Sequence, residues 1–262
     1  MKRAENADMS AELCVAMQAA YAAAEISRAY YGGNFTVKIK ADMTPVTQAD
    51  VECEEKIREI ILDNFPDDGF FGEETARTQS NAENVWLVDP IDGTKGFVRQ
   101  YPFFSTQIAL MRAGELVLGV SIGTMMEELA FAERGKGAWL NDERLQVSGI
   151  DSLERATLST GNLKTLAGSA GWKKLGEIVA TVDRIRGYGD FYHYHLLAAG
   201  KIDAVIESDV NILDIAALSV IVTEAGGVFT DLSGAPPGLE TTSVLAANPA
   251  LHQELLGSLG AS

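Results

Sequence analysis

The sequence of 262 residues has few cysteines, little positive charge and no long apolar run. Its two cysteines, Cys14 and Cys53, have neither a metal-binding nor a redox-motif spacing. A disulfide framework is therefore excluded, and a reducing compartment is expected. Lys and Arg total 21 against 37 Asp and Glu, which gives a net charge of −16. Because such an acidic protein repels nucleic acid and anionic membranes, and no local basic stripe offsets the charge, we expect neither partner.

The longest apolar stretch, residues 212–222, contains Asp214 and is too short to span a bilayer. The first eight residues contain no apolar core of the kind that signal peptides have. These absences predict a soluble, cytoplasmic protein. Hydrophobic residues make up 47% and charged residues 22% of the chain, which is ordinary for a globular protein.

The first half of the chain predicts helices that pack on an antiparallel sheet. The spacing of apolar residues predicts helices at 9–31 and 48–64 and a half-buried strand at 35–40. Two short apolar strands, at 70–72 and 85–88, run directly into acidic residues. Several short strands between residues 104 and 140 predict an antiparallel meander.

From about residue 153, strands and helices alternate, which is typical of an α/β architecture. We predict helices at 171–182, 190–199 and 214–225 and from about 249, and strands at 156–159, 184–186, 204–206, 228–230 and 244–246. The chain is thus expected to form two closely packed parts. Residues 1–150 would be an α+β part that carries most of the acidic sites, and residues 151–262 an α/β part.

The segment DPIDGT, residues 89–94, is the most informative part of the sequence. Pro90 cannot continue a central strand, so we expect the chain to turn there. A turn can bring Asp89 and Asp92 to one side, whereas in a straight strand they would face opposite ways. Asp and Gly are also ordinary turn formers, so this segment alone leaves a purely structural role open.

The end of the same segment is suited to binding phosphate. Gly93 lets the backbone approach another group closely. The N–H groups of Gly93 and Thr94 lie at the expected start of a helix, which favours an anion.

Two further acidic sites accompany this segment. Glu73 follows an apolar strand, and Asp50 lies at a helix start with Thr47 three residues before it. Grouped carboxylates without a counter-charge raise one another's pKa. A hard divalent cation removes that cost, and oxygen ligands suit Mg²⁺, which also binds substrate phosphate. The haloacid-dehalogenase phosphatases have a similar Asp-x-Asp-Gly-Thr string, but here two residues separate the carboxylates, so that geometry is lost.

Three strings together resemble the inositol monophosphatase family of metal-dependent phosphatases. They are GEE at 72–74, WLVDPIDGT at 86–94, and LDIAA at 213–217 followed by EAGG at 224–227. Their order and separation match as well, so the resemblance spans nearly the whole chain. It implies a layered αβαβα phosphatase fold, a small phosphorylated substrate and a homodimer.

The resemblance also implies a role for each matching residue. The residues that would bind Mg²⁺ are Glu73, Asp89, Ile91 (through its carbonyl), Asp92 and Asp214. Those that would position or activate the attacking water are Asp50, Glu73 and Thr94. Those that would contact the substrate are Gly93, Thr94, Asp190, Glu207 and Asp214. A bound metal lowers the pKa of water, clamps the phosphate oxygens and neutralises the leaving oxygen, so no covalent intermediate is required.

Two departures from the family pattern concern the substrate. Many members have Trp before the last metal ligand, where this chain has Leu213, and this argues against inositol. The string RGYGDFYHY at 186–194 resembles the histidinol-phosphate phosphatase branch, where a Gly-Asp pair and a following Tyr occupy this place. Histidinol phosphate carries an ammonium group and an imidazole, which Asp190 and Glu207 could attract.

Simpler roles stay open for these residues. Asp190 could serve only as a helix N-cap, and Glu207 could be an exposed strand end. His193 and His195 would lie about 200° apart on a helix and cannot face one ligand, so we interpret them as surface or packing residues. The three tryptophans are interpreted as core residues: Trp86, Trp139 and Trp172.

Four functions are compatible with the sequence. The first is a Mg²⁺-dependent histidinol-phosphate phosphatase, and the second an inositol-1-monophosphatase or broad sugar-phosphate phosphatase. The third is a phosphatase for 3'-phosphoadenosine 5'-phosphate. The fourth is a binding or regulatory protein that keeps the metal site without turnover, against which the intact acidic set argues.

Overall fold

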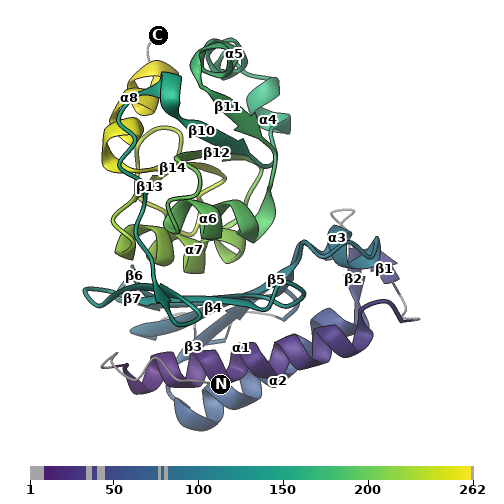
Figure 1. Cartoon of the computed structure of the whole chain (residues 1–262). Helices are drawn as coiled ribbons and strands as arrows, with labels where there is room; N and C mark the ends of the chain where they lie inside the picture. Colours follow the sequence, from purple (N-terminus) through teal and green to yellow (C-terminus); the bar gives the residue numbers. More distant parts are fainter. Residues whose placement is uncertain (1–8, 34–36, 40–44, 76–77, 80–81, 261–262) are drawn as a thin grey trace.

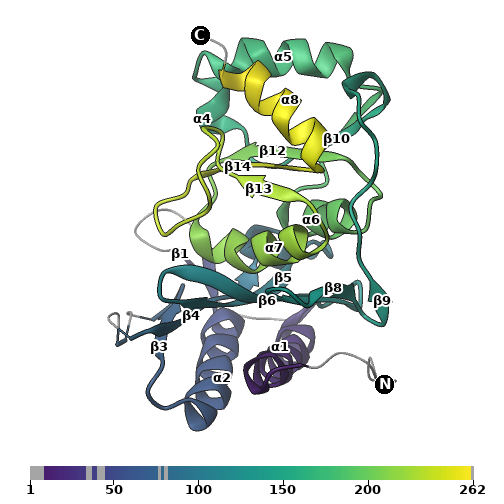
Figure 2. The ribbon, with the colours of Figure 1, turned by 90° about the vertical axis from the view of Figure 1, so that its left-hand side faces the viewer.

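The structure is a computed structural model that describes residues 9–33, 37–39, 45–75, 78–79 and 82–260. Its helices and sheets alternate in five layers (Figures 1 and 2). The outer layer at the bottom of Figure 1 holds α1 (Ala11–Tyr30) and α2 (Gln48–Asn64). The central layer holds α6 (Asp190–Ala198) and α7 (Ile212–Glu224), and the opposite outer layer holds α4 (Lys164–Ala167), α5 (Gly171–Thr181) and α8 (Pro249–Gly260). Two sheets separate these layers, so the predicted αβαβα fold is confirmed.

The larger sheet lies between the α1–α2 layer and the central helices, with strand order β3-β4-β5-β6-β7-β8-β9. Its strands are β3 (Gly69–Gly72), β4 (Asn84–Asp92), β5 (Ser105–Arg112), β6 (Glu115–Gly123), β7 (Glu128–Glu133), β8 (Gly137–Leu140) and β9 (Glu143–Arg144). β3 pairs with β4 in parallel, and from β4 onward each strand is antiparallel to the next. The meander predicted between residues 104 and 140 is therefore confirmed.

The smaller sheet is mixed and has the order β11-β10-β12-β14-β13. Its strands are β10 (Thr157–Thr160), β11 (Arg184–Arg186), β12 (Ala204–Ser208), β13 (Val228–Thr230) and β14 (Ser243–Ala247). Four short elements complete the described chain: β1 (Val37–Ile39), β2 (Pro45–Thr47), α3 (Thr94–Val98) and the 3₁₀ helix η1 (Leu153–Arg155). Residues 35, 36 and 40 of the predicted strand at 35–40 lie outside the described residues. The division at residue 150 stays a prediction, since α6 and α7 contact both sheets.

Helix α7 is apolar on all sides because it is covered on both sides. Every residue from 212 to 222 except Asp214 is buried, which explains why this is the longest apolar run of the sequence. Gly119 of β6 permits the close packing, since a Cβ there would lie 2.3 Å from the carbonyl oxygen of Ala217. Among the described helices, none combines the length and the apolar character that a bilayer span requires.

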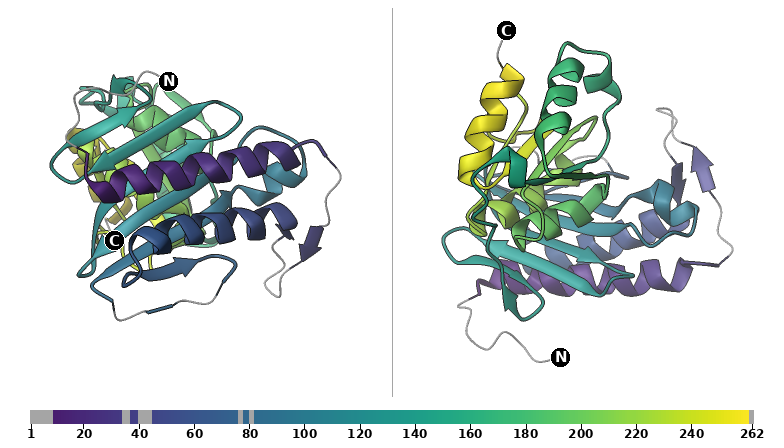
Figure 3. Two further views of the ribbon diagram at one scale, coloured as in Figure 1. Left: turned by 90° about the horizontal axis from the view of Figure 1, so that it is seen from below. Right: turned by 45° about the horizontal axis from the view of Figure 1, so that its top comes forward.

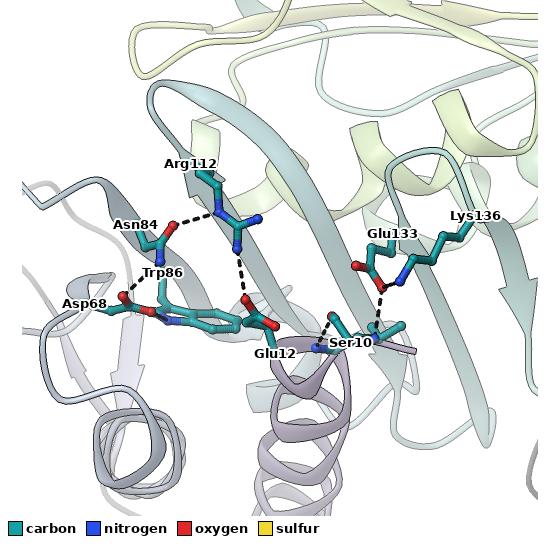
Figure 4. Close-up of polar contacts among 9 residues, drawn as sticks. Ser10, Glu12, Asp68, Asn84, Trp86, Arg112, Glu133 and Lys136 are labelled. Carbon is teal, nitrogen blue, oxygen red and sulfur yellow. Dashed lines mark hydrogen bonds and ion pairs between the residues drawn. The ribbon is translucent and has the colours of Figure 1, made fainter. Parts of the chain in front are cut away.

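Helices α1 and α2 lie side by side across the larger sheet (Figure 3), and polar contacts fix the N-terminal end of α1 (Figure 4). Arg112 of β5 donates to Glu12 of α1 and to Asn84 of β4, both at 2.9 Å. Asn84 donates to Asp68 at 3.1 Å, and Asp68 also accepts the indole N–H of Trp86 at 2.9 Å. Trp86 is fully buried, as predicted, with its polar atom paired.

Two predictions about side chains require correction. Trp172 is 50% exposed rather than in the core, because α5 belongs to an outer layer and buries only Leu175 and Ile178. His193 and His195 are both buried, so a surface position is wrong and packing within the central layer is correct. Trp139 is half-buried at the edge of the core.

Candidate active site

Strand β4 continues through Pro90 to Asp92, which corrects the predicted turn at Pro90. The pairing changes register here, because Asp89 lies opposite Gln107 whereas Asp92 lies opposite Ser105. β4 thus holds one extra residue, and this bulge places Pro90 where no ladder donor is needed. Gln107 and Ser105 lie two residues apart on β5 and therefore share a face of the sheet. The bulge thus brings their partners Asp89 and Asp92 to one side despite the odd spacing of the two aspartates.

Asp214, near the start of α7, joins these two carboxylates. One oxygen from each of Asp89, Asp92 and Asp214 lies within 4.8 Å of the others. Asn211, the N-cap of α7, holds Asp214 in place through its backbone N–H (2.9 Å) and its side-chain amide (2.7 Å). This capping box makes the helix start and the acidic group one structural unit.

The other two carboxylates are also oriented by hydrogen bonds. The backbone N–H of Ile91 donates to Oδ1 of Asp89 at 3.0 Å. The hydroxyl of Ser105 donates to Oδ2 of Asp92 at 3.1 Å. Because a carboxylate offers about four lone-pair sites, each group retains acceptor capacity toward the centre of the cluster.

The group of three, Asp89, Asp92 and Asp214, resists ionisation. Burial, followed by the charges of Glu73 and Asp92, raises the pKa of Asp89 well above its usual range. Burial and the charge of Asp214 do the same for Asp92, and burial raises the pKa of Asp214 to about 7. Within the described part of the chain, no Lys, Arg or His forms an ion pair with these three. An all-oxygen, anionic donor set of this kind fits a hard divalent cation.

Glu73 faces the same space without belonging to the tight group of three. Its charge contributes to the raised pKa of both Asp89 and Asp214, and it lines the same cleft. Ile91 lines the cleft as well. The structure therefore gathers all five residues that the resemblance assigns to metal around one cavity, although their role as ligands stays a proposal.

Asp50 and Thr94 meet beside this group. Asp50 is buried near the start of α2, where the N–H and hydroxyl of Thr47 donate to its Oδ2 at 2.7 and 2.6 Å. The hydroxyl of Thr94 lies 3.3 Å from Oδ1 of Asp50 and 3.0 Å from the carbonyl oxygen of Ile91. Burial raises the pKa of Asp50. Gly93, the N-cap of α3, has a φ of +85°, and a Cβ there would lie 2.7 Å from a backbone oxygen.

The cleft has a volume of about 500 Å³, and Asp190 forms part of its wall. Asp190 is the first residue of α6 and has a φ of +44°, an uncommon value for a non-glycine residue. Gly189 occupies the N-cap position, and no side-chain cap hydrogen bond forms, so Asp190 does not act as an N-cap. Burial raises the pKa of Asp190, an effect that His193 opposes.

Glu207 lies behind the cleft wall rather than on it. Its side chain is buried, accepts a hydrogen bond from the Tyr194 hydroxyl and is 3.4 Å from Nε2 of His193. A Cβ on Gly161, which lines the cleft, would lie 1.9 Å from Oε2 of Glu207. Gly161 therefore lies between Glu207 and the cleft, and Glu207 is buried rather than an exposed strand end.

Sequence reasoning missed Glu54, a buried carboxylate under the Glu73 segment. Its Oε2 accepts the backbone N–H of Glu74 at 2.7 Å, and a Cβ on Gly72 would lie 2.4 Å from its carboxyl carbon. The signal was present in the sequence, because Glu54 lies four residues after Asp50 on the same face of a helix.

The layered fold and the carboxylate cleft define a phosphatase of the αβαβα class. A sequence model of the inositol monophosphatase family matches residues 8–261, so the chain belongs to this family of phosphatases, which act on small phosphorylated substrates and are generally metal-dependent. The histidinol-phosphatase of Mycobacterium tuberculosis is 37% identical over 262 residues, covering 95% of this chain and 98% of that protein. An inositol-1-monophosphatase of Rhizobium meliloti is 35% identical over 252 residues, covering 94% and 95%. The crystal structure of extragenic suppressor protein suhB from Bartonella henselae superposes with a TM-score of 0.89 at 33% identity, covering 97% of this chain and 100% of that one.

Proposed function

We propose that this chain is a Mg²⁺-dependent phosphatase that hydrolyses L-histidinol phosphate to L-histidinol and phosphate. The observation that carries the proposal is Asp190 in the wall of the cleft that also holds the group of three. The substrate's phosphate suits a metal held by three carboxylates, and its ammonium group suits a further carboxylate nearby. A hydrogen bond between charged groups contributes about 1.5–3 kcal/mol, enough to select this substrate over an uncharged polyol.

The residues that would hold Mg²⁺ are Glu73, Asp89, Ile91 (through its carbonyl), Asp92 and Asp214. Mg²⁺ is favoured because every donor is an oxygen. When bound, it would lower the pKa of a water, clamp the phosphate oxygens and stabilise the charge on the leaving oxygen. The raised pKa values of the metal-free cluster mean that this cation replaces protons that the carboxylates would otherwise hold.

Thr94 and Asp50 would position the attacking water. The single hydroxyl proton of Thr94 is directed at Asp50 or at the Ile91 carbonyl, so the lone pairs of the Thr94 oxygen can accept a hydrogen bond from a water in the cleft. Asp50 is anchored by Thr47 and can receive a proton through Thr94 as the water is deprotonated.

Different parts of the cleft would bind the two ends of the substrate. The backbone of Gly93 and Thr94 would bind the phosphate beside the cluster. Asp190 would bind the ammonium group. Glu207 would add negative potential from behind Gly161, which has no side chain to hold the Glu207 carboxylate away from the cleft. Asp214 would contact both the metal and the substrate.

The test is phosphate release by the purified protein with Mg²⁺ from histidinol phosphate, inositol 1-phosphate and 3'-phosphoadenosine 5'-phosphate, with EDTA as the control. Asp190→Asn removes the charge and retains a residue that tolerates positive φ. It should raise the KM for histidinol phosphate about tenfold or more and change that for inositol 1-phosphate less than about threefold. Asp209→Asn is the matched control, since Asp209 lines the same cleft but its carboxylate is already bonded to Thr165 and Ser208.

The second candidate function is hydrolysis of inositol 1-phosphate. It is supported by the similarity to the Rhizobium meliloti protein, which is named an inositol-1-monophosphatase. Equal losses on both substrates in Asp190→Asn would contradict selection by charge and support this candidate. A metal-loaded protein that is inert toward all three substrates would instead support a binding role.

We also propose, from the family resemblance, that the enzyme is a cytoplasmic homodimer. Light scattering coupled to size exclusion would test the assembly, and a monomeric mass across the working concentration range would contradict it.

A further inference from the structure

A buried chain of hydrogen bonds begins at Asp92 and runs away from the cleft. Ser105 donates to Oδ2 of Asp92 at 3.1 Å. Nε2 of Gln107 lies 2.7 Å from Oγ of Ser105 and 3.0 Å from Oγ of Ser121. The two serines and Gln107 are at most 1% exposed, so these bonds form in a water-poor interior where unpaired polar groups are costly.

The chain ends on helix α6. Nε2 of His195 lies 2.9 Å from Oγ of Ser121, and Nδ1 of His195 lies 3.0 Å from Oε2 of Glu128 on β7. His195 is 1% exposed and packs edge-on against Phe191 of the same helix. The helix that begins with Asp190 in the cleft wall is thereby linked to Asp92 in the carboxylate cluster.

The hydrogen atoms can be assigned along the first part of the chain. With a metal bound, Asp92 would be ionised and could only accept, so its bond with Ser105 uses the single hydroxyl proton of Ser105. Ser105 must therefore accept from Gln107, which fixes the orientation of the Gln107 amide. Its second N–H then points at Ser121, while its Oε1 is buried without a hydrogen-bond partner. An orphaned carbonyl is a cost that the protein accepts in order to direct both N–H groups at serines.

The same reasoning assigns the second part. Since Ser121 accepts from Gln107, its own proton is available for Nε2 of His195. The Glu128 carboxylate can only accept, so Nδ1 of His195 carries the ring proton and donates to Glu128. In the neutral ring Nε2 is then the unprotonated acceptor for the Ser121 hydroxyl. Burial lowers the pKa of His195, which favours this neutral form of the ring.

We propose that His195 is a positioning residue for the metal site: by accepting the Ser121 proton, it sets the direction of the bonds that hold Asp92 among Asp89 and Asp214. Without an acceptor on His195, the Ser121 proton would need another partner, and among the residues of this hydrogen-bond chain the unpartnered acceptor is Oε1 of Gln107. That change of partner would rotate the amide and remove the donor from Ser105. This inference rests on the proposed function, because it assumes that Asp92 binds a metal.

Two substitutions at His195 separate its two contacts. Glutamine reaches the position of Nε2 and can still accept from Ser121, whereas asparagine reaches only the position of Nδ1 and can still donate to Glu128. His195→Gln should therefore retain the chain, and His195→Asn should break it. Ser121→Ala breaks the same link from the other side, and it carries the prediction if His195→Asn does not fold.

The primary readout is Mn²⁺ affinity, measured without substrate by the electron paramagnetic resonance of free Mn²⁺. His195→Asn and Ser121→Ala should each bind Mn²⁺ about tenfold more weakly, the lower end of the range for outer partners of metal ligands. His195→Gln should stay within about threefold of the wild type. The double variant, His195→Asn with Ser121→Ala, should bind Mn²⁺ no more weakly than Ser121→Ala alone, because both substitutions break the same hydrogen bond. His195→Asn and Ser121→Ala should each need about tenfold more Mg²⁺ for half-maximal turnover, and their kcat at saturating Mg²⁺ should change little.

The matched control is His252→Asn. His252 is also a buried histidine bonded to a hydroxyl, at 2.9 Å from Oγ1 of Thr230, but it lies on α8 in an outer layer. The substitution His252→Asn should lower the unfolding temperature by about as much as His195→Asn does, and it should leave Mn²⁺ affinity unchanged.

Wild-type affinity in His195→Asn, additive losses in the double variant, or an equal loss in His252→Asn would each overturn the inference. If the wild type binds Mn²⁺ and hydrolyses phosphate monoesters while these results appear, only the positioning role fails. A wild type that neither binds Mn²⁺ nor turns over any substrate overturns the proposed function and this inference with it.

Discussion

Ionisation of Asp214 should destabilise the metal-free protein as the pH rises. In the folded protein the pKa of Asp214 is raised from 3.8 to about 7, mainly by burial. Between these two values the folded state holds a proton that the unfolded state has released. The folded state then binds more protons, so the free energy of unfolding falls with increasing pH and levels off above about pH 7.

The size of the effect follows from the pKa difference. Each pKa unit corresponds to about 1.36 kcal/mol, and Asp214 is already half ionised in the folded state at pH 7, so Asp214 alone should lower the free energy of unfolding by about 2.3 kcal/mol between pH 5 and pH 7. For a chain of this size, that amounts to about 5–10 °C in unfolding temperature. Burial also raises the pKa values of Asp89 and Asp92, which act in the same direction.

The assay is calorimetric unfolding in EDTA from pH 5 to pH 7.5, for the wild type and Asp214→Asn. Two buried histidines, His195 and His252, have lowered pKa values and oppose the trend below about pH 6.5, so the comparison with the variant isolates Asp214. Asp214→Asn loses one bond of the capping box with Asn211, at about 1 kcal/mol, which offsets most of the linkage gain at pH 5, so the two proteins should differ little in stability there. Near pH 7.5 the variant should be more stable by several degrees.

Metal should reverse this order. Mg²⁺ competes with protons for the cluster, so it should stabilise the wild type more at pH 7.5 than at pH 5 and should stabilise Asp214→Asn little at either pH. The reasoning would be refuted by a difference between variant and wild type in EDTA that stays constant or shrinks as the pH rises.

Three further substitutions test the packing at the cleft, between the larger sheet and α7, and in an outer layer. Gly161→Ala would place a Cβ 1.9 Å from Oε2 of Glu207, and displacement of that carboxylate should weaken turnover of histidinol phosphate on the order of tenfold to a hundredfold without changing Mn²⁺ affinity. Gly119→Ala would press on the carbonyl of Ala217 at 2.3 Å and should cost about 1–3 kcal/mol in chemical denaturation, whereas an unchanged midpoint would show that α7 can move away. Trp172→Ala removes a side chain that is 50% exposed and should change stability by about 0.5 kcal/mol or less, and a larger loss would mean that Trp172 packs against something.

Most of the helices and strands could be predicted because their information is local. Apolar spacing and end signals located α2 at Gln48–Asn64 and placed Asp50 at its start. The structure adds that Thr47 and Asp50 form a capping box there, which was not predicted. The alternation after residue 153 likewise indicated helices between strands. Pro90 misled the prediction, because a bulge in a paired strand needs a partner strand that the local sequence does not reveal.

The candidate site divides in the same way. The types and order of its acidic residues were readable in the sequence, since several acidic strand ends and helix starts occur together in it and match the family's strings in order and separation. Their convergence was not readable, because Asp214 lies more than a hundred residues from Asp92 and meets it only when α7 packs on the sheet. Glu207 shows the limit, because its position seven residues before Asp214 did not reveal that Gly161 lies between it and the cleft.

The element types, the family and the acidic chemistry could therefore be inferred from the sequence, because they depend on short strings of residues and on the order of those strings. Which polar groups are buried, and in which direction their hydrogen bonds run, depends on the packing of the layers. Ser105, Gln107, Ser121 and His195 are unremarkable in the sequence. They form one hydrogen-bond chain because β5, β6 and α6 pack together and bury them. Burial is a property of the assembled layers. It raises the pKa values of the carboxylates and strengthens each of these hydrogen bonds.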